Sequence, residues 1–254
     1  MSKSIIACRP YSYAPFLDVA YEHLASLDVR HVEIEVPAAE QLQATREELD
    51  RHGIQASSLQ GVFDVSRADP ADQIAGQMPA CEALGASLLF LSVKAGETPL
   101  DTVYGRLREA GQVAAEHHVT IVMETHPDLI TNGTVARATM EGVNHPNVRV
   151  NFDTANVYYY NKGVDGAEEL RKIAEYVAAV HLKETDGGFE RWCFPALGRG
   201  IVKFPEVFDV LDAGGFAGPC TLEIEGIEGE TKTERLVCDR IAESVGYLRG
   251  LGRL

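Results

Sequence analysis

The sequence predicts an α/β protein, a closed (β/α)8 barrel of parallel strands. Eight short apolar runs recur along the chain, and stretches of helical period lie between them. Alternating strands and helices indicate a parallel sheet, and 254 residues suit eight such units. An open doubly wound sheet is the alternative, but the first strand-to-helix connection, 8–15, has no glycine-rich phosphate loop. No Pro/Gly/Ser-rich linker divides the chain, so we expect residues 1–254 to form a single barrel domain.

The predicted elements alternate along the whole chain. Strands are expected at 4–8, 31–36, 54–60, 87–93, 119–124, 148–153, 178–183 and 220–225. Apolar residues three or four positions apart predict the helices between them. The clearest helical patterns cover 20–27, 74–81, 103–110, 170–177 and 237–248, and weaker ones cover 41–52, 134–143 and 204–211.

The composition excludes several classes of function. The formal net charge of −15 and the pI near 4.9 argue against binding a phosphate backbone, so nucleic acid is not an expected partner. Five cysteines without CxxC spacing indicate a reduced, cytoplasmic protein. The first residues lack a signal-type apolar stretch, and no uncharged run reaches about 18 residues. Neither secretion by that route nor a membrane span is expected.

Four predicted strands in the second half of the chain each end near a residue that can bind a divalent metal: Glu124, Asp153, His181 and Glu223. Strand side chains alternate between two faces, and here one face is apolar while the other carries the ligand-type residue. An inward charge without a partner is costly, and a shared cation supplies a partner for all four. The steps of 29, 28 and 42 residues each span about one strand–helix unit. In a barrel the carboxyl ends of the strands surround one mouth, so the four side chains are expected to converge there.

The predicted site binds one divalent ion. Three carboxylates and one imidazole are mostly hard ligands, which favours Mn²⁺, with Mg²⁺ or Co²⁺ as alternatives and Zn²⁺ less favoured. The longer last step between ligands coincides with the loop 185–203, which is expected to cover the site.

Neighbouring side chains are expected to bind the substrate. His126 and Lys183 share the inward face of Glu124 and His181, one step further along their strands. Glu33 on the second strand is expected to line the same mouth. For Glu35 and Gln60, lining the mouth and pairing with charged residues at its rim are both open.

Two further motifs have competing interpretations. Tyr158, Tyr159, Tyr160 and Trp192 can form an apolar wall for a sugar ring or a subunit interface, of which the interface is preferred. With the apolar helix near 236–251, they predict a homo-oligomer, a dimer or a tetramer. The segment 198–200, Gly-Arg-Gly, is a weak signal for phosphate binding, so a phosphorylated substrate is not expected.

Four segments of the chain resemble the sugar phosphate isomerase/epimerase family, whose members fold as a xylose-isomerase-like TIM barrel. These segments are Val122-Met123-Glu124-Thr125-His126, Asn151-Phe152-Asp153-Thr154-Ala155-Asn156, His181-Leu182-Lys183-Glu184 and Leu222-Glu223-Ile224-Glu225. The similarity extends over nearly the whole chain, including 196–200 and the helix start at Phe204-Pro205. It is specific for the fold and the metal, and it says little about the substrate.

The resemblance implies a metal-dependent enzyme. In the family's ketose 3-epimerases the matching Glu, Asp, His and Glu hold Mn²⁺ or a similar ion, and the two glutamates also move the proton. Those roles fall on Glu124 and Glu223. Family epimerases commonly carry a substrate-binding His three residues after the metal-binding Asp, where this chain has Asn156. Asn156 is expected to bind the substrate at this position. The endonuclease IV branch uses many additional His ligands for a trinuclear zinc site, whereas only eight His occur here.

The expected reaction starts with proton abstraction from a ketose or keto-polyol. The metal stabilises the enediolate, and Glu124 and Glu223 act as base and acid from opposite faces. Reprotonation then gives epimerisation or isomerisation. Loss of a β-leaving group from the same enediolate gives the alternative function, a lyase or dehydratase acting on a keto-sugar, inosose or dehydroshikimate-like substrate, which Asn156 favours. A non-catalytic sugar-binding barrel is the weaker alternative.

Overall fold

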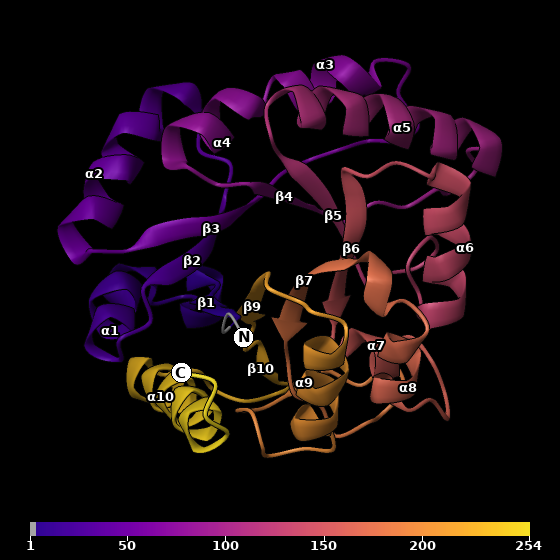
Figure 1. The fold of residues 1–254 in the computed structure, drawn as a ribbon. Helices are drawn as coiled ribbons and strands as arrows, with labels where there is room; N and C mark the ends of the chain where they lie inside the picture. Colours follow the sequence, from indigo (N-terminus) through magenta and orange to yellow (C-terminus); the bar gives the residue numbers. More distant parts are fainter. Residues whose placement is uncertain (1–3) are drawn as a thin grey trace.

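The computed structural model describes residues 4–254 and confirms the predicted barrel (Figure 1). Its eight parallel strands close in the order β1-β2-β3-β4-β5-β6-β7-β9, because β9 pairs with both β7 and β1. Every predicted strand is present, with ends shifted by a few residues. The strands are β1 (Ile5–Cys8), β2 (His31–Glu35), β3 (Gln55–Gln60), β4 (Leu88–Leu91), β5 (Thr120–Glu124), β6 (Val148–Asp153), β7 (Val177–Leu182) and β9 (Pro219–Leu222).

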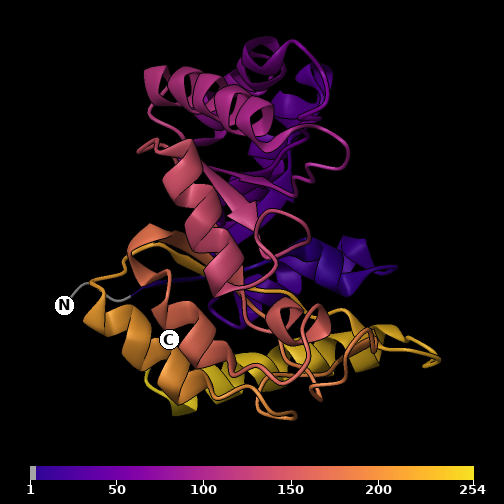
Figure 2. The same ribbon diagram turned by 90° about the vertical axis from the view of Figure 1, so that its right-hand side faces the viewer.

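Helices form a ring around the barrel, which Figure 2 shows from the side with α6 facing the viewer. The ring closes where α10 packs against the 3-10 turn Pro10–Tyr13 that follows β1. No helix within residues 4–254 is long and apolar enough to cross a membrane. The helices are α1 (Ala20–Ser26), α2 (Leu42–His52), α3 (Pro70–Ala75), α4 (Met78–Leu84), α5 (Leu100–Glu116), α6 (Gly133–Val143), α7 (Asn156–Tyr159), α8 (Gly166–Arg171), α9 (Phe204–Ala213) and α10 (Glu234–Gly250).

The strands bury apolar side chains on both faces, as expected for a parallel barrel. Their outer faces pack under the helices in the main core. On the inner face a separate small cluster fills the barrel, formed by Leu88 and Phe90 from β4, Val122 from β5 and Ala179 from β7. The Phe90 ring lies under the His181 ring, with centroids 4.8 Å apart. This apolar cluster therefore lies next to the polar residues at the strand ends.

Two predicted helices differ in the structure. The pattern at 74–81 is divided between α3 and α4, because Pro79 lies in the first turn of α4, where a proline fits a helix start but not its interior. The pattern at 170–177 ends with α8 and a short 3-10 turn, so the helix prediction is wrong from 172 onward. Val177 instead opens β7 and pairs with Val150 of β6, because sheet pairing outweighs the local helical spacing.

A second, two-stranded sheet was not predicted. Its strands, β8 (Cys193–Phe194) and β10 (Gly226–Ile227), pair in antiparallel fashion. β8 belongs to the loop after β7, and β10 follows β9. The small sheet therefore ties the loop 185–203 to the segment beyond β9, at the end of the barrel where the candidate ligands lie.

Candidate active site

The four candidate ligands converge at the carboxyl ends of β5, β6, β7 and β9. One ligand atom each from Glu124, Asp153, His181 and Glu223 lies within 4.8 Å of the others, and all four residues are buried. Glu124 and Asp153 are the last residues of their strands, and Glu223 directly follows β9. Consecutive strands of a closed barrel thus bring together residues that are far apart in the sequence, as the strand pattern predicted.

Asp153 uses its two oxygens differently. Oδ1 accepts hydrogen bonds from the backbone N–H groups of Ala155 and Asn156, both at 2.8 Å, where the chain turns into α7. Oδ2 is buried and has no hydrogen-bond partner among the described residues. Burial raises the pKa of Asp153 to about 7, a shift that Lys183 opposes and Glu223 reinforces. One oxygen therefore anchors the side chain while the other faces the cluster.

His181 directs its Nδ1 atom toward the carboxylates of the cluster. Its Nε2 lies 2.9 Å from Glu33 Oε1, while Nδ1 lies 3.3 Å from both Glu124 Oε1 and Glu223 Oε2. Neither of the Nδ1 contacts has hydrogen-bond geometry, so this buried atom also lacks a partner among the described residues. Burial lowers the pKa of His181, but the charges of Glu33 and Glu223 outweigh it and raise the pKa. Two buried donor atoms without partners, beside two carboxylates, fit a divalent cation.

Glu33 lies behind His181 rather than beside the substrate-binding residues predicted with it. It is 2% exposed. Its carboxylate accepts a hydrogen bond from Ser58 Oγ at 2.7 Å, and Arg9 Nε lies 3.5 Å away. A carboxylate on the far nitrogen of a metal-binding His fixes the tautomer and the orientation of the ring. The contacts of Glu33 therefore favour positioning of His181 over contact with substrate.

A cavity of about 240 Å³, the metal-side cavity, lies beside the four candidate ligands. Glu124 and Glu223 both line it, which places two of the ligands next to any bound molecule. Three of the predicted substrate-binding residues also line it: His126, Asn156 and Lys183. The strand-end pattern thus located the cluster and part of the surrounding wall.

Glu124 and His126 form a close pair. His126 Nδ1 lies 2.6 Å from Glu124 Oε2 and 3.0 Å from Ser92 Oγ. Burial raises the pKa of Glu124, but the close contacts with His126 and His181 outweigh it and lower the pKa to about 2. His126 is therefore placed to orient this carboxylate at the edge of the cavity.

Lys183 lies in the cavity wall among acidic side chains. Its Nζ is 3.4 Å from both Glu223 Oε2 and Asn156 Oδ1, and it forms an ion pair with Glu225. Burial lowers the pKa of Lys183, but the charges of Glu223, Asp153 and Glu225 outweigh it and raise the pKa above its usual value. The ammonium group therefore stays charged and can donate hydrogen bonds into the cavity.

Arg9, which the sequence did not single out, directly follows β1 and lines the metal-side cavity. Its guanidinium pairs with Glu223 and donates a hydrogen bond to Gln60. Burial raises the pKa of Glu223, but Lys183, His181 and Arg9 outweigh it and hold the pKa well below its ordinary range. Arg9 stands at a strand end, and strand-end position was the signal that identified the four ligands. The same search at the end of the first strand would have found Arg9.

The aromatic cluster forms part of the cavity wall. Tyr159, Tyr160 and Trp192 line the cavity, and the Tyr160 ring centroid lies 5.3 Å from that of His126. Tyr158 is instead buried, and its hydroxyl accepts a hydrogen bond from the Gly166 N–H at 2.9 Å. This placement favours the apolar wall among the two interpretations, and a subunit interface stays a prediction.

Glu184 fixes the loop that carries Trp192. Its buried carboxylate accepts hydrogen bonds from the backbone N–H groups of Thr185 and Val202 at 3.0 Å and of Gly198 at 2.9 Å. A Cβ at Gly200 would collide with the Thr185 carbonyl oxygen and the Glu184 carboxylate, so only glycine fits there. The loop 185–203 is thus folded around one acidic side chain.

The same contacts bear on the possible phosphate loop at 198–200. The N–H of Gly198 already donates to Glu184, and Arg199 forms an ion pair with Glu243 on α10. These two groups of the segment are therefore engaged within the chain, and the expectation of an unphosphorylated substrate stays a prediction.

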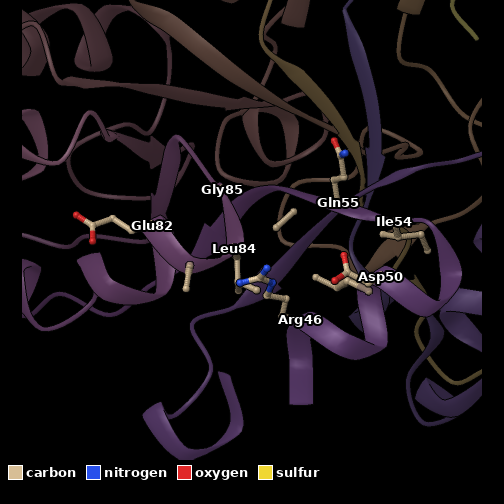
Figure 3. A pocket seen from close by; sticks show the side chains of 10 residues that line it. Arg46, Asp50, Ile54, Gln55, Glu82, Leu84 and Gly85 are labelled. Atoms are coloured by element: carbon tan, nitrogen blue, oxygen red, sulfur yellow. The ribbon is translucent and has the colours of Figure 1, made fainter. Parts of the chain in front are cut away.

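A larger groove, of about 450 Å³, lies at the opposite end of the barrel (Figure 3). It is lined by Arg46 and Asp50 of α2, Ile54 and Gln55 at the start of β3, and Glu82 of α4. Residues at the amino ends of barrel strands serve stability, whereas catalysis takes place at the carboxyl ends. We therefore assign the chemistry to the metal-side cavity.

Comparison with known proteins agrees with this geometry. A ketose 3-epimerase of Arthrobacter globiformis is 25% identical over 224 residues, covering 78% of this chain and 73% of that protein. A 3-dehydroshikimate dehydratase of Bacillus anthracis is 25% identical over 129 residues, 44% of this chain and 45% of that protein. The crystal structure of an IOLI protein with a bound zinc atom shares the fold, with a TM-score of 0.75 and 17% identity over 95% of this chain and 96% of that one. The model of the xylose isomerase-like TIM barrel family matches residues 21–241, so the chain belongs to this family.

Proposed function

We propose that this chain is a divalent-metal-dependent isomerase or epimerase that acts on a ketose or keto-polyol. The convergence of four buried ligand-type side chains beside a cavity carries this proposal. Asp153 Oδ2 and His181 Nδ1 have no other partner among the described residues, as expected for atoms that bind a cation. The similarity to a ketose 3-epimerase over 78% of the chain supports a ketose as substrate.

The metal would be held by Glu124, Asp153, His181 and Glu223. Three carboxylates and one imidazole favour Mn²⁺, with Mg²⁺ or Co²⁺ as alternatives. Zn²⁺, which the IOLI structure contains, accepts the same ligand types and is the less favoured choice. When bound, the ion supplies Lewis acidity to a substrate carbonyl, which makes the proton on the adjacent carbon more acidic.

Glu124 and Glu223 are the proposed base and acid. They come from different strand ends and both line the cavity, so a substrate carbon between them can lose a proton to one and gain it from the other. His126 orients the Glu124 carboxylate, whereas Arg9 and Lys183 hold Glu223. Return of the proton to the other face of the same carbon gives epimerisation, and its return to the neighbouring carbon gives isomerisation.

We assign substrate binding to His126, Asn156 and Lys183, which line the cavity and carry hydrogen-bonding groups for sugar hydroxyls. Tyr159, Tyr160 and Trp192 supply an apolar wall, and amphipathic aromatic rings suit the apolar face of a sugar. Glu33 is assigned to positioning of His181 instead, because its carboxylate contacts the ring nitrogen that faces away from the cluster.

A lyase or dehydratase acting on a keto-sugar, inosose or dehydroshikimate-like substrate is the alternative function. Two observations favour it: Asn156 replaces the His that the resemblance leads one to expect, and a 3-dehydroshikimate dehydratase is 25% identical over 129 residues. The first proton abstraction is common to both functions. They differ in whether a β-leaving group departs afterwards.

Proton–deuterium exchange followed by NMR in D₂O tests both functions. The Mn²⁺-loaded protein is incubated with free ketoses, keto-inositols and 3-keto-glycosides while solvent exchange and products are followed together. Exchange with retention of all oxygens establishes an isomerase or epimerase. Exchange accompanied by loss of water or another leaving group establishes the lyase. If no ketone exchanges, the remaining alternative is a non-catalytic barrel that binds a sugar.

A cytoplasmic location and homo-oligomeric assembly are further proposals. The free cysteines support a reducing compartment, and the net charge of −15 supports the expectation that nucleic acid is not a partner. Gel filtration with light scattering measures the number of subunits directly.

A further inference from the structure

A second hollow, of about 380 Å³, lies next to the metal-side cavity. It lies at the carboxyl ends of β1, β2 and β3, and we call it the aromatic hollow after Tyr11 and Tyr21, which line it. Arg9 and Gln60 line both the hollow and the metal-side cavity. Arg9 also donates a hydrogen bond to Gln60, so this pair of side chains belongs to a wall that the two spaces share.

The metal-side cavity is small compared with most ligand sites. Ligand sites usually measure about 300–1,000 Å³. The metal-side cavity, at about 240 Å³, lies below that range and has to accommodate a metal ion as well. The volumes of the metal-side cavity and the aromatic hollow together fall within the usual range. The two spaces share the wall that contains Arg9 and Gln60.

The lining of the hollow is suited to an apolar ring. Its walls include Tyr11 and Leu17, which are 64% and 49% exposed, although large apolar side chains gain free energy from burial. Three of its polar side chains are already engaged elsewhere, since Arg9 pairs with Gln60 and Glu33 contacts His181. The hollow therefore offers mainly apolar and aromatic surface, with the Glu35 carboxylate and the hydroxyls of Tyr11 and Tyr21 as its remaining polar groups.

We propose that the aromatic hollow is a second substrate subsite, which binds an aromatic substituent attached to the keto-sugar. The natural substrate is then an aryl glycoside of a keto-sugar, or a conjugate of similar size, rather than a free ketose. This inference rests on the proposed function, because the keto-sugar ring has to occupy the metal-side cavity. Arg9 and Gln60 lie where the sugar is joined to its substituent.

Isothermal titration of the Mn²⁺-loaded protein tests this inference without relying on turnover. The probes are the phenyl and the methyl β-glycoside of 3-keto-glucose, which differ only in the substituent. Burial of the phenyl ring should make its Kd lower than that of the methyl glycoside by a factor of about ten or more. Leu17→Trp fills the hollow and should abolish this difference while changing the Kd of the methyl glycoside less than about twofold.

Two further variants separate the subsite from general effects. Tyr11→Ala removes one wall and should also weaken binding of the phenyl glycoside, by a factor of about ten. Leu100→Trp is the matched control, because Leu100 is 53% exposed, begins α5 and lines neither space. It should leave both Kd values unchanged.

The subsite is refuted if the phenyl and methyl glycosides bind equally, or if Leu17→Trp keeps the phenyl preference. Binding of neither glycoside, together with proton exchange on a free ketose, refutes the subsite and leaves the proposed function standing. A phenyl preference that Leu17→Trp abolishes, without proton exchange on any ketone, supports the subsite and overturns the proposed catalytic function.

Discussion

Asp153 and Glu184 are two fully buried carboxylates at the same end of the barrel, and they differ in how they are satisfied. Both residues are 0% exposed. Both oxygens of Glu184 accept backbone N–H groups from the loop it anchors. Only one oxygen of Asp153 is used in this way, and the other faces three ligand-type side chains without a hydrogen-bond partner in the described chain.

This difference separates a structural acid from a functional one. Buried polar groups are almost always hydrogen-bonded, so a buried oxygen without a partner needs an explanation. Glu184 needs none, because its hydrogen bonds account for its burial. Asp153 Oδ2 and His181 Nδ1 are explained together by a shared cation. Burial alone would not have distinguished Asp153 from Glu184.

The largest effect is expected at the two glutamates that we assign to proton transfer. Glu124→Gln and Glu223→Gln keep the side-chain size but remove the proton acceptor, so each should lower turnover by a factor of about 10²–10⁴. Turnover is measured on the substrate identified by proton exchange. Glu243→Gln on α10 is the control, since that carboxylate pairs with Arg199 outside the cavity. Near-native turnover in either active-site variant would exclude the two-carboxylate mechanism.

A large loss of metal affinity is expected from Asp153→Asn. The amide oxygen can still accept the N–H groups of Ala155 and Asn156, so the turn into α7 keeps its hydrogen bonds. The anionic oxygen that faces the cluster is lost, and Mn²⁺ affinity should fall by a factor of at least about 100. The melting temperature of metal-free protein should not fall, whereas its increase on adding Mn²⁺ should shrink.

Titration calorimetry with Mn²⁺ and thermal melts with and without the ion measure both parts of this prediction. If Asp153→Asn destabilises the metal-free protein as strongly as the loaded protein, then Asp153 is a structural acid like Glu184. The contrast between the two carboxylates would then be wrong.

Glu184→Gln should have the opposite pattern. A Gln side chain places an N–H₂ group against the backbone N–H donors of the loop, so at least one hydrogen bond is replaced by a repulsive contact. The free energy of unfolding should fall by about 1–3 kcal/mol, equally with and without Mn²⁺. Urea denaturation measures this, with Glu243→Gln expected within about 0.5 kcal/mol of native. A loss of Mn²⁺ affinity without a loss of stability would contradict the structural role.

The sequence was sufficient for the barrel and for the four candidate ligands, because both depend on local regularities. Strand alternation and strand ends are visible within a few residues, and a closed barrel then brings successive strand ends to one mouth. Glu124, Asp153, His181 and Glu223 follow from these two rules. His126 and Lys183 follow from them as well, since both line the cavity one step beyond a ligand.

Other features depend on contacts that no local pattern contains. Glu33 and His181 are 148 residues apart, and Arg9 and Glu223 are 214 apart, so their pairing is visible only once the barrel has closed. The role of Glu184 depends on the path of the loop it anchors. The start of β7 at Val177 likewise depends on pairing with β6, which outweighed the helical spacing of the preceding residues.

The smallest effect is expected at a third kind of carboxylate, Asp212 on the surface of α9. It makes two hydrogen bonds with Arg253, at 2.9 and 2.8 Å, and its side chain is 45% exposed. Hydrogen bonds from Arg253 lower the pKa of Asp212, so the pair stabilises the folded state above the ordinary carboxyl pKa and loses this contribution as the pH falls through the lower folded-state value. Because solvent screens an exposed pair, Asp212→Asn should cost at most about 1 kcal/mol at pH 7. Urea denaturation of both proteins, from pH 7 down to the lowest pH at which the native chain stays folded, should show the difference shrinking, and added salt should reduce it at pH 7. A cost of several kcal/mol would show that satisfied carboxylates support this fold wherever they lie, and burial would then not be the property that sets Glu184 apart.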